Sequence, residues 1–264
     1  MRLTTLGLSD VGQKRSHNED SYLINDELRL FVVADGMGGH AGGGTASRIA
    51  VETIEKSLLG ARENGTDPFQ GGQALERSPI PEHFREAVEA ACYSIFHTAR
   101  REPQLAGMGT TVTALLLAES DQEGMVDAFL AHVGDSRMYL IRGEILQQIS
   151  EDHSLVNEQI KAGVITAEEA RHSRFKNIIT RSVGFEEDVL VDVMGLSAEP
   201  GDVFIMCSDG CSNLVEDREF LELTHKFQGD RIKDLPQALI DLANERGGDD
   251  NITVVVVRVD GSTQ

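Results

Sequence analysis

The stretch Phe31-Val32-Val33-Ala34-Asp35-Gly36-Met37-Gly38-Gly39-His40 is an apolar run that stops at a carboxylate. Apolar runs bordered by an aspartate recur along the chain. One leads to Asp135, one leads to Asp209-Gly210, and one begins after Asp249-Asp250. We therefore predict four strands that each carry a carboxylate at one end.

Carboxylates gathered at one end of a sheet system would repel one another, by about 4 kcal/mol for each pair at an intermediate dielectric. A cation has to offset this repulsion, and hard oxygen donors suit Mg²⁺ or Mn²⁺ better than Zn²⁺. For any single Asp-Gly pair, a simple turn is the favoured alternative. The recurrence of the pattern favours a metal site instead.

The composition limits the possible partners and the compartment. A net charge of -20 over 264 residues argues against binding to nucleic acid or to an anionic membrane. No apolar stretch reaches the roughly 18 to 20 residues of a membrane span, and the start of the chain has no signal-peptide core. Three cysteines, at positions 92, 207 and 211, lack metal-ligand spacing. We expect a cytoplasmic protein with one domain over residues 1–264.

The spacing of apolar residues predicts antiparallel strands and two pairs of helices. One pair covers residues 45–58, capped by Thr45, and the region from Pro81 to Pro103; the second covers 220–227 and 232–243. Strands are expected over 3–9, 22–25, 30–34, 110–118, 125–133, 137–141, 145–149, 189–196, 203–207 and 251–259. Residues 154–180 change character and are interpreted as a flap beside the site. This order of elements indicates a layered α+β domain.

Six short motifs follow one another along the chain. They are Arg15-Ser16-His17-Asn18-Glu19-Asp20, Asp35-Gly36-Met37-Gly38-Gly39-His40, Gly109-Thr110-Thr111, Gly134-Asp135-Ser136-Arg137, Ser208-Asp209-Gly210 and Asp250-Asn251. Together they resemble the bacterial branch of the metal-dependent serine/threonine phosphatases, the PP2C family, over about residues 3–259. The resemblance implies a four-layer αββα sandwich, two antiparallel sheets flanked by helix pairs, with a binuclear metal centre at one end.

The resemblance also implies which residues hold the ions. Asp35 would bridge two Mn²⁺ or Mg²⁺ ions and take part in catalysis. Gly36 would contribute its backbone carbonyl, and Asp209 and Asp250 would complete the shell of the first ion. Asp135 would help to hold a weaker third ion, with a structural turn as the open alternative.

Three further positions are expected beside the ions. Glu19 and Asp20 would orient metal-bound waters. Arg15 would bind the substrate phosphate, because an arginine fork can bond two phosphate oxygens at once. Without the resemblance, a solvated loop charge would be the simpler interpretation of Arg15.

The implied reaction is hydrolysis of phosphoserine and phosphothreonine in proteins by direct attack of a metal-activated water. A cysteine nucleophile is not expected, because no cysteine is followed six positions later by an arginine. The implied partners are phosphorylated proteins and an opposing bacterial Ser/Thr kinase, and we expect a monomer. Met37 stands where many eukaryotic members carry histidine, which leaves His40 or a metal-bound water as the general acid.

Two other functions compete with this one. A phosphoprotein-binding scaffold on the same fold would have lost the metal carboxylates, and here they are all present. A two-metal hydrolase of small phosphoesters or phosphodiesters would keep them. Activity on a phosphothreonine peptide, compared with cyclic nucleotides and sugar phosphates, separates these functions.

Overall fold

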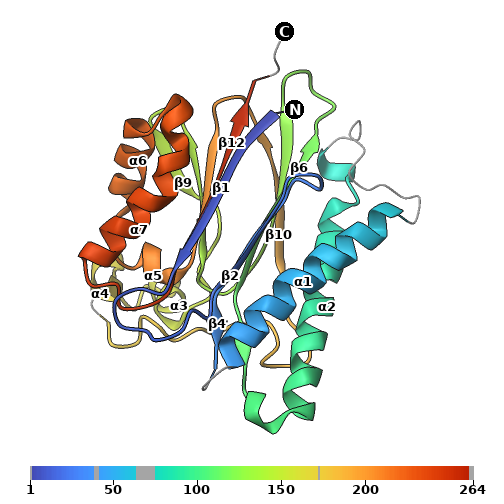
Figure 1. The fold of residues 1–264 in the computed structure, drawn as a ribbon, viewed down its shortest axis with the longest axis vertical. Coiled ribbons are helices and arrows are strands. Elements are labelled where there is room, and N and C mark those ends of the chain that lie inside the picture. Colours follow the sequence, from blue (N-terminus) through green and yellow to red (C-terminus); the bar gives the residue numbers. More distant parts are fainter. Residues whose placement is uncertain (1, 39–41, 64–74, 172, 262–264) are drawn as a thin grey trace.

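The strands form two five-stranded antiparallel sheets, and helices cover the outer face of each sheet (Figure 1). The computed structural model describes residues 2–38, 42–63, 75–171 and 173–261. The layers follow the order helices, sheet, sheet, helices, which confirms the predicted α+β sandwich. No helix in the described part of the chain is long and apolar enough to cross a membrane.

The first sheet joins the two ends of the chain. Its strands lie in the order β1 (Arg2–Asp10), β12 (Ile252–Asp260), β11 (Val203–Cys207), β8 (Arg137–Arg142) and β9 (Ile145–Gln148). The register of β1 with β12 runs from Arg2 opposite Asp260 to Asp10 opposite Ile252. The loop that follows β1 therefore starts beside the segment that precedes β12.

The second sheet comes from the first three quarters of the chain. Its strands lie in the order β10 (Asp192–Ala198), β7 (Val126–Val133), β6 (Val112–Glu119), β3 (Leu30–Ala34) and β2 (Ser21–Asn25). A short ladder of β4 (Gly36–Met37) with β5 (Gly109–Thr110) lies just beyond β3 and β6. This ladder fixes the chain that leaves β3 against the chain that enters β6.

Two groups of helices enclose the sheets. Helices α1 (Gly42–Glu63) and α2 (Ile80–Arg101) pack on the second sheet. Helices α5 (Asp209–Ser212), α6 (Asp217–Lys226) and α7 (Leu235–Glu245) pack on the first. The predicted flap carries α3 (Leu155–Lys161) and α4 (Ala167–Arg171), and 3-10 turns occur at Leu75–Arg77, Pro103–Leu105 and Gly229–Asp234.

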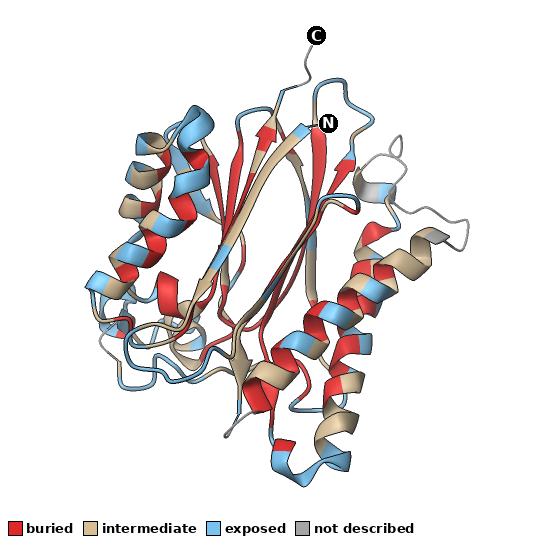
Figure 2. Ribbon diagram, in the orientation of Figure 1, coloured by how far each residue is buried: buried red, intermediate tan, exposed pale blue. Residues whose placement is uncertain are grey.

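Three apolar layers hold the sandwich together, and each central strand contributes to two of them. In β3, Leu30, Val32 and Ala34 face α1 and α2, whereas Phe31 and Val33 face the other sheet. Because both faces are buried, such strands are continuous apolar runs in the sequence (Figure 2). Each fully buried Leu, Val or Phe side chain stabilises the fold by about 1.5–3 kcal/mol.

The start of α1 differs from the prediction. The sequence predicts a helix capped by Thr45, but α1 begins at Gly42, so that prediction is wrong. Glycine is a poor helix former, which is why the pattern points to a later start. At Gly43, however, a Cβ would lie 2.6 Å from the Gly36 carbonyl oxygen. The glycines therefore allow the first turn of α1 to dock directly on β4.

Candidate active site

The four predicted strand-end aspartates lie at ends of central strands. Asp35 follows β3, Asp135 follows β7 after one glycine, Asp209 begins α5 just after β11, and Asp250 comes shortly before β12. In Figure 1 the segments around β4 and α5 lie at the lower end of the sheets, away from both chain termini. The topology thus brings together acids that are far apart in the sequence.

The pKa of Asp35 reflects how crowded this end is. Its side chain remains partly exposed, yet its pKa is raised well above the ordinary value, first by burial among its neighbours and then by the negative charges of Asp20, Asp209, Asp135 and Asp250. The carboxyl of Asp35 also lies within hydrogen-bond reach of Asp209. We call these five residues the acidic cluster.

The pKa values of two other members of the acidic cluster, Asp135 and Asp209, are also raised. Burial, and then the charges of Asp209 and Asp152, raise the pKa of Asp135 to about 8. Burial and the charge of Asp250 raise the pKa of Asp209. The protein alone therefore disfavours the charged forms of these carboxyls, and a bound cation would reverse that preference.

Two hydroxyl groups hold Asp20 within the acidic cluster. Its Oδ2 accepts hydrogen bonds from Ser208 Oγ at 2.8 Å and from Thr253 Oγ1 at 2.6 Å. Burial still raises the pKa of Asp20 to about 7. No role for Thr253 is predicted from the sequence, although a threonine within the apolar run of β12 is an available signal.

Unpaired oxygens test whether the cluster suits a metal. Among the described residues, Asp20 Oδ1, Asp135 Oδ1 and Glu19 Oε1 are buried without a hydrogen-bond partner. Buried oxygens normally have partners, so this donor set fits hard divalent cations such as Mg²⁺ or Mn²⁺. The same part of the chain contains no group of three or more His, Cys, Asp or Glu side chains already arranged to hold an ion. Rotation of carboxyl groups would have to complete the shell.

Two threonines fix the backbone that presents Asp35 and Gly36. Thr110 Oγ1 and the Thr111 N–H both donate to the Asp35 carbonyl oxygen at 2.9 Å, and the Asp35 N–H donates to Thr111 Oγ1 at 2.9 Å. Gly36 pairs with Thr110 between β4 and β5. A Cβ on Gly36 would lie 2.1 Å from the Gly43 carbonyl oxygen, so no side chain fits there.

The side chain of Asn251 holds the loop between β1 and β2. Its Oδ1 accepts from the Glu19 N–H at 2.8 Å. Its Nδ2 donates to the carbonyl oxygens of Val11 at 3.0 Å and His17 at 2.9 Å. Asn251 is 5% exposed, so these bonds are shielded from water. Asn251 belongs to one of the six motifs, but its role in holding this loop is not predicted from the sequence.

Arg15 lies in the same loop, at the solvent side of the cluster. Its Nη2 forms an ion pair with Asp250 Oδ2 at 2.7 Å, and its side chain is 49% exposed. The guanidinium is therefore next to a predicted metal ligand and accessible from solvent. His40, one predicted source of the general acid, lies outside the described residues.

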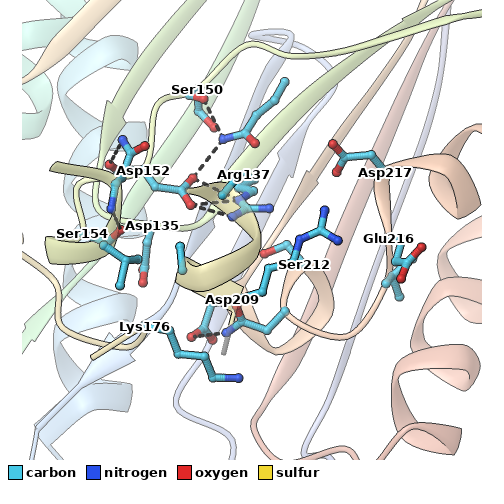
Figure 3. Close-up of a pocket in the computed structure, with 18 of the residues that line it drawn as sticks. Asp135, Arg137, Ser150, Asp152, Ser154, Lys176, Asp209, Ser212, Glu216 and Asp217 are labelled. Atoms are coloured by element: carbon cyan, nitrogen blue, oxygen red, sulfur yellow. Dashed lines mark hydrogen bonds and ion pairs between the residues drawn. The ribbon is translucent and has the colours of Figure 1, made fainter. Parts of the chain in front are cut away.

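A cavity of about 530 Å³ lies beside Asp135 and Asp209 (Figure 3). Lys176 of the predicted flap lines one side, and Glu216 and Asp217 at the start of α6 line another. The walls thus carry charges of both signs.

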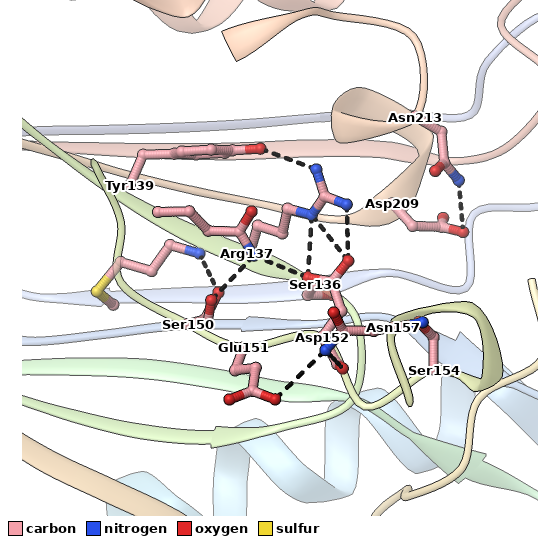
Figure 4. Close-up of polar contacts among 12 residues, drawn as sticks. Ser136, Arg137, Tyr139, Ser150, Glu151, Asp152, Ser154, Asn157, Asp209 and Asn213 are labelled. Carbon is pink, nitrogen blue, oxygen red and sulfur yellow. Dashed lines mark hydrogen bonds and ion pairs between the residues drawn. The ribbon is translucent and has the colours of Figure 1, made fainter. Parts of the chain in front are cut away.

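Arg137 borders this cavity but does not pair with Asp135. Its Nε donates to Asp152 Oδ1 at 3.0 Å, and its Nη2 donates to Asp152 Oδ2 at 2.6 Å (Figure 4). Its Nη1 donates to the Tyr139 hydroxyl at 3.2 Å. Because Asp152 takes the guanidinium, Asp135 keeps an oxygen available for another partner.

Comparison with known proteins identifies the family. A family model described as protein phosphatase 2C matches residues 12–239. The chain belongs to the protein phosphatase 2C family. The serine/threonine phosphatase stp of Listeria monocytogenes is 35% identical over 256 residues, which cover 96% of this chain and 94% of that protein.

Solved structures of PP2C phosphatases share the fold. The Mycobacterium tuberculosis phosphatase PstP/Ppp is 33% identical and superimposes with a TM-score of 0.82. The match covers 98% of this chain and 99% of the PstP/Ppp chain. The catalytic domain of PstP in complex with 2 manganese ions is 36% identical and superimposes with a TM-score of 0.78. That match covers 98% of this chain and 99% of the PstP chain. The predicted family, fold class and enzyme class, a PP2C-type serine/threonine phosphatase, are confirmed. The predicted use of Mn²⁺ or Mg²⁺ agrees with the family.

Proposed function

We propose that this PP2C phosphatase hydrolyses phosphoserine and phosphothreonine in proteins with two Mn²⁺ or Mg²⁺ ions bound at the acidic cluster. One observation carries the proposal. Five carboxyls from distant parts of the chain meet, and burial and mutual repulsion raise the pKa values of Asp20, Asp35, Asp135 and Asp209. Divalent cations are the ligands that would compensate this arrangement.

The residues of the cluster would divide the binding of the ions. Asp35 would bridge them, while Asp209, Asp250 and the Gly36 carbonyl would complete the shell of one. Asp135, which lies against the cavity, would hold a weaker third ion. Bound divalent ions supply an activated water and neutralise charge on the phosphoryl group under attack.

Three neighbouring residues would orient water and substrate. Glu19 and Asp20 each have a buried oxygen without a partner in the described chain, so each can accept a hydrogen bond from a water. The exposed guanidinium of Arg15 would bind two phosphate oxygens. The phosphorylated residue would then sit between Arg15 and Asp35, and the flanking peptide would reach the cavity under the flap.

The substrate is a phosphorylated protein, and a bacterial Ser/Thr kinase would supply it. We further propose a cytoplasmic monomer in which residues 1–264 form one domain with a flap at about 154–180. The pairing of β1 with β12 supports one domain, because it joins both ends of the chain in one sheet. The net charge of -20 supports a site without nucleic-acid partners.

Hydrolysis of a phosphothreonine peptide with and without Mn²⁺ tests this proposal. Asp209→Asn should lower kcat/KM by more than the roughly 10- to 100-fold typical of losing a group that merely supports a ligand. Asp230→Asn makes the same chemical change at an exposed position and should behave as wild type. Full turnover after metal removal, or in Asp209→Asn, would contradict the mechanism. Faster cleavage of cyclic nucleotides or sugar phosphates would contradict the substrate class.

A further inference from the structure

The flap is attached to the acidic cluster at His153. The His153 N–H donates to the Gly134 carbonyl oxygen at 2.8 Å, and the Thr180 N–H donates to the His153 carbonyl oxygen at 2.9 Å. Ser154 also bridges to Ile179. The two ends of the flap are therefore joined to each other and fastened to the glycine that precedes Asp135.

The His153 side chain adds a bond to the same glycine. The Gly134 N–H donates to His153 Nδ1 at 3.0 Å. A backbone N–H can only donate, so Nδ1 carries a lone pair and the ring proton is on Nε2. His153 Nε2 in turn donates to Asp192 Oδ2 at 3.0 Å. The imidazole is thus held at both nitrogens, in one tautomer.

Asp192 is itself fixed by a third group. Arg181 Nη1 donates to Asp192 Oδ1 at 2.6 Å, so each carboxylate oxygen has its own partner. His153 is 6% exposed, and burial lowers its pKa, which keeps the ring neutral. A continuous chain of bonds therefore runs from Arg181 through Asp192 and His153 to Gly134.

The turn at Gly134 has little freedom to absorb a displacement. Gly134 has a φ of 110°, and a Cβ there would lie 2.5 Å from the Thr111 side chain. Thr111 is the residue that bonds the backbone of Asp35. A shift of Gly134 would therefore move Asp135 directly and press on the support of Asp35.

We propose that His153, held in its Nε2-protonated tautomer by Asp192, is a positioning residue that sets the place of Asp135 and couples the flap to the acidic cluster. The proposal rests on the proposed metal-dependent function. The competing interpretation is a buried histidine that serves only the stability of the fold. The two differ in what they predict for metal binding.

The tautomer can be measured directly. In ¹⁵N NMR spectra of the whole protein, wild-type His153 should show a protonated Nε2 and a bare Nδ1. In Asp192→Asn, the amide oxygen has to face Arg181, which only donates, so the amide NH₂ faces His153 and forces the ring proton to Nδ1. That proton would oppose the Gly134 N–H. A wild-type ring protonated at Nδ1, or an unchanged ring in Asp192→Asn, would overturn the assignment.

Two substitutions of His153 separate its two bonds. Asn carries an oxygen near the position of Nδ1 and can still accept from Gly134, whereas Gln carries an amide near the position of Nε2 and keeps only the bond to Asp192. His153→Gln and Asp192→Asn should weaken Mn²⁺ binding at the third site, the one that Asp135 would hold, by roughly 10- to 100-fold in calorimetry. His153→Asn should restore binding to near the wild-type level. The KM for a phosphopeptide should follow the same order.

Glu187→Gln provides a matched control, because Glu187 pairs with His97 at 3.1 Å on the outer helix α2. It should leave both Mn²⁺ binding and the His153 tautomer unchanged. Mn²⁺ binding by folded His153→Gln equal to that of wild type would overturn the proposal; if that variant does not fold, Asp192→Asn decides in its place. A wild type without phosphatase activity would refute the proposed function instead, while the tautomer and the Mn²⁺ titration would still test the role of His153.

Discussion

Asn251 connects the last strand to the loop that carries Arg15. Asn251→Ala would leave the Glu19 N–H and the carbonyl oxygens of Val11 and His17 without their partners. Each orphaned buried group costs about 1–3 kcal/mol, so the free energy of unfolding in urea should fall by at least that amount. The KM for a phosphothreonine peptide should rise more than kcat falls, because the arginine loses its support.

Asn25 in β2 is a suitable comparison, because its side chain also makes two hydrogen bonds, to Glu55 and to the Leu28 N–H. Asn25→Ala should lower stability and leave the KM unchanged. If Asn251→Ala and Asn25→Ala have the same KM, the side chain of Asn251 does not position the phosphate-binding loop.

Local sequence predicts the acids of the candidate site but not the residues that hold them in place. Asp35 and Asp209 each follow an apolar run, and that pattern is visible within ten residues of sequence. The bond between Asn251 and Glu19 joins positions 232 residues apart, and no local pattern records it. Arg137 likewise pairs with Asp152 and not with Asp135, its neighbour in the same motif, and no local pattern records this pairing either.

At the scale of elements, the first turn of α1 acts as a wall of the site. Gly43→Ala would place a Cβ 2.6 Å from the Gly36 carbonyl oxygen and 2.7 Å from Glu19 Oε1. Both atoms belong to residues proposed to serve the ions, so Mn²⁺ affinity should fall, by roughly 10-fold or more. Isothermal calorimetry with Mn²⁺ measures this directly.

The same helix contains its own control. A Cβ on Gly60 would meet nothing within 4 Å, so Gly60→Ala should raise the free energy of unfolding by about 0.5–1 kcal/mol, through helix propensity, with unchanged Mn²⁺ binding. Equal Mn²⁺ affinity in the Gly43 and Gly60 variants would show that the helix start does not shape the site.

Element boundaries were predictable where burial alone sets them. The predicted strands 30–34 and 203–207 coincide with β3 and β11, because both faces of these strands are buried and the apolar runs end where the sheets end. The start of α1 was not predictable. Its glycines are selected by contact with β4, and that contact overrides their poor helix propensity.

For the molecule as a whole, the acidic cluster links folding to proton and metal binding. The folded protein raises the pKa of Asp20 to about 7 and that of Asp135 to about 8, from an ordinary value of 3.8. The folded state therefore holds protons that the unfolded state has already lost. The free energy of unfolding of the metal-free protein should fall as pH rises through this range. The lowered pKa values of buried His132 and His153 have the opposite effect: below pH 6.5, the ordinary pKa of histidine, they make the free energy of unfolding rise with pH.

In the window from about pH 7.5 to 8.5 the carboxyls titrate with little contribution from histidine, since unfolded histidines, with an ordinary pKa of about 6.5, are by then largely neutral. The Tm of the EDTA-treated protein should decrease across this window, and Asp20→Asn, which removes one of the titrating groups, should decrease less. Mn²⁺ binds the deprotonated carboxylates, so the rise in Tm on adding Mn²⁺ should be larger at pH 8.5 than at pH 7.5. A metal-free Tm that is level or rising across the window, or an Mn²⁺ effect independent of pH, would show that the cluster is not the metal site.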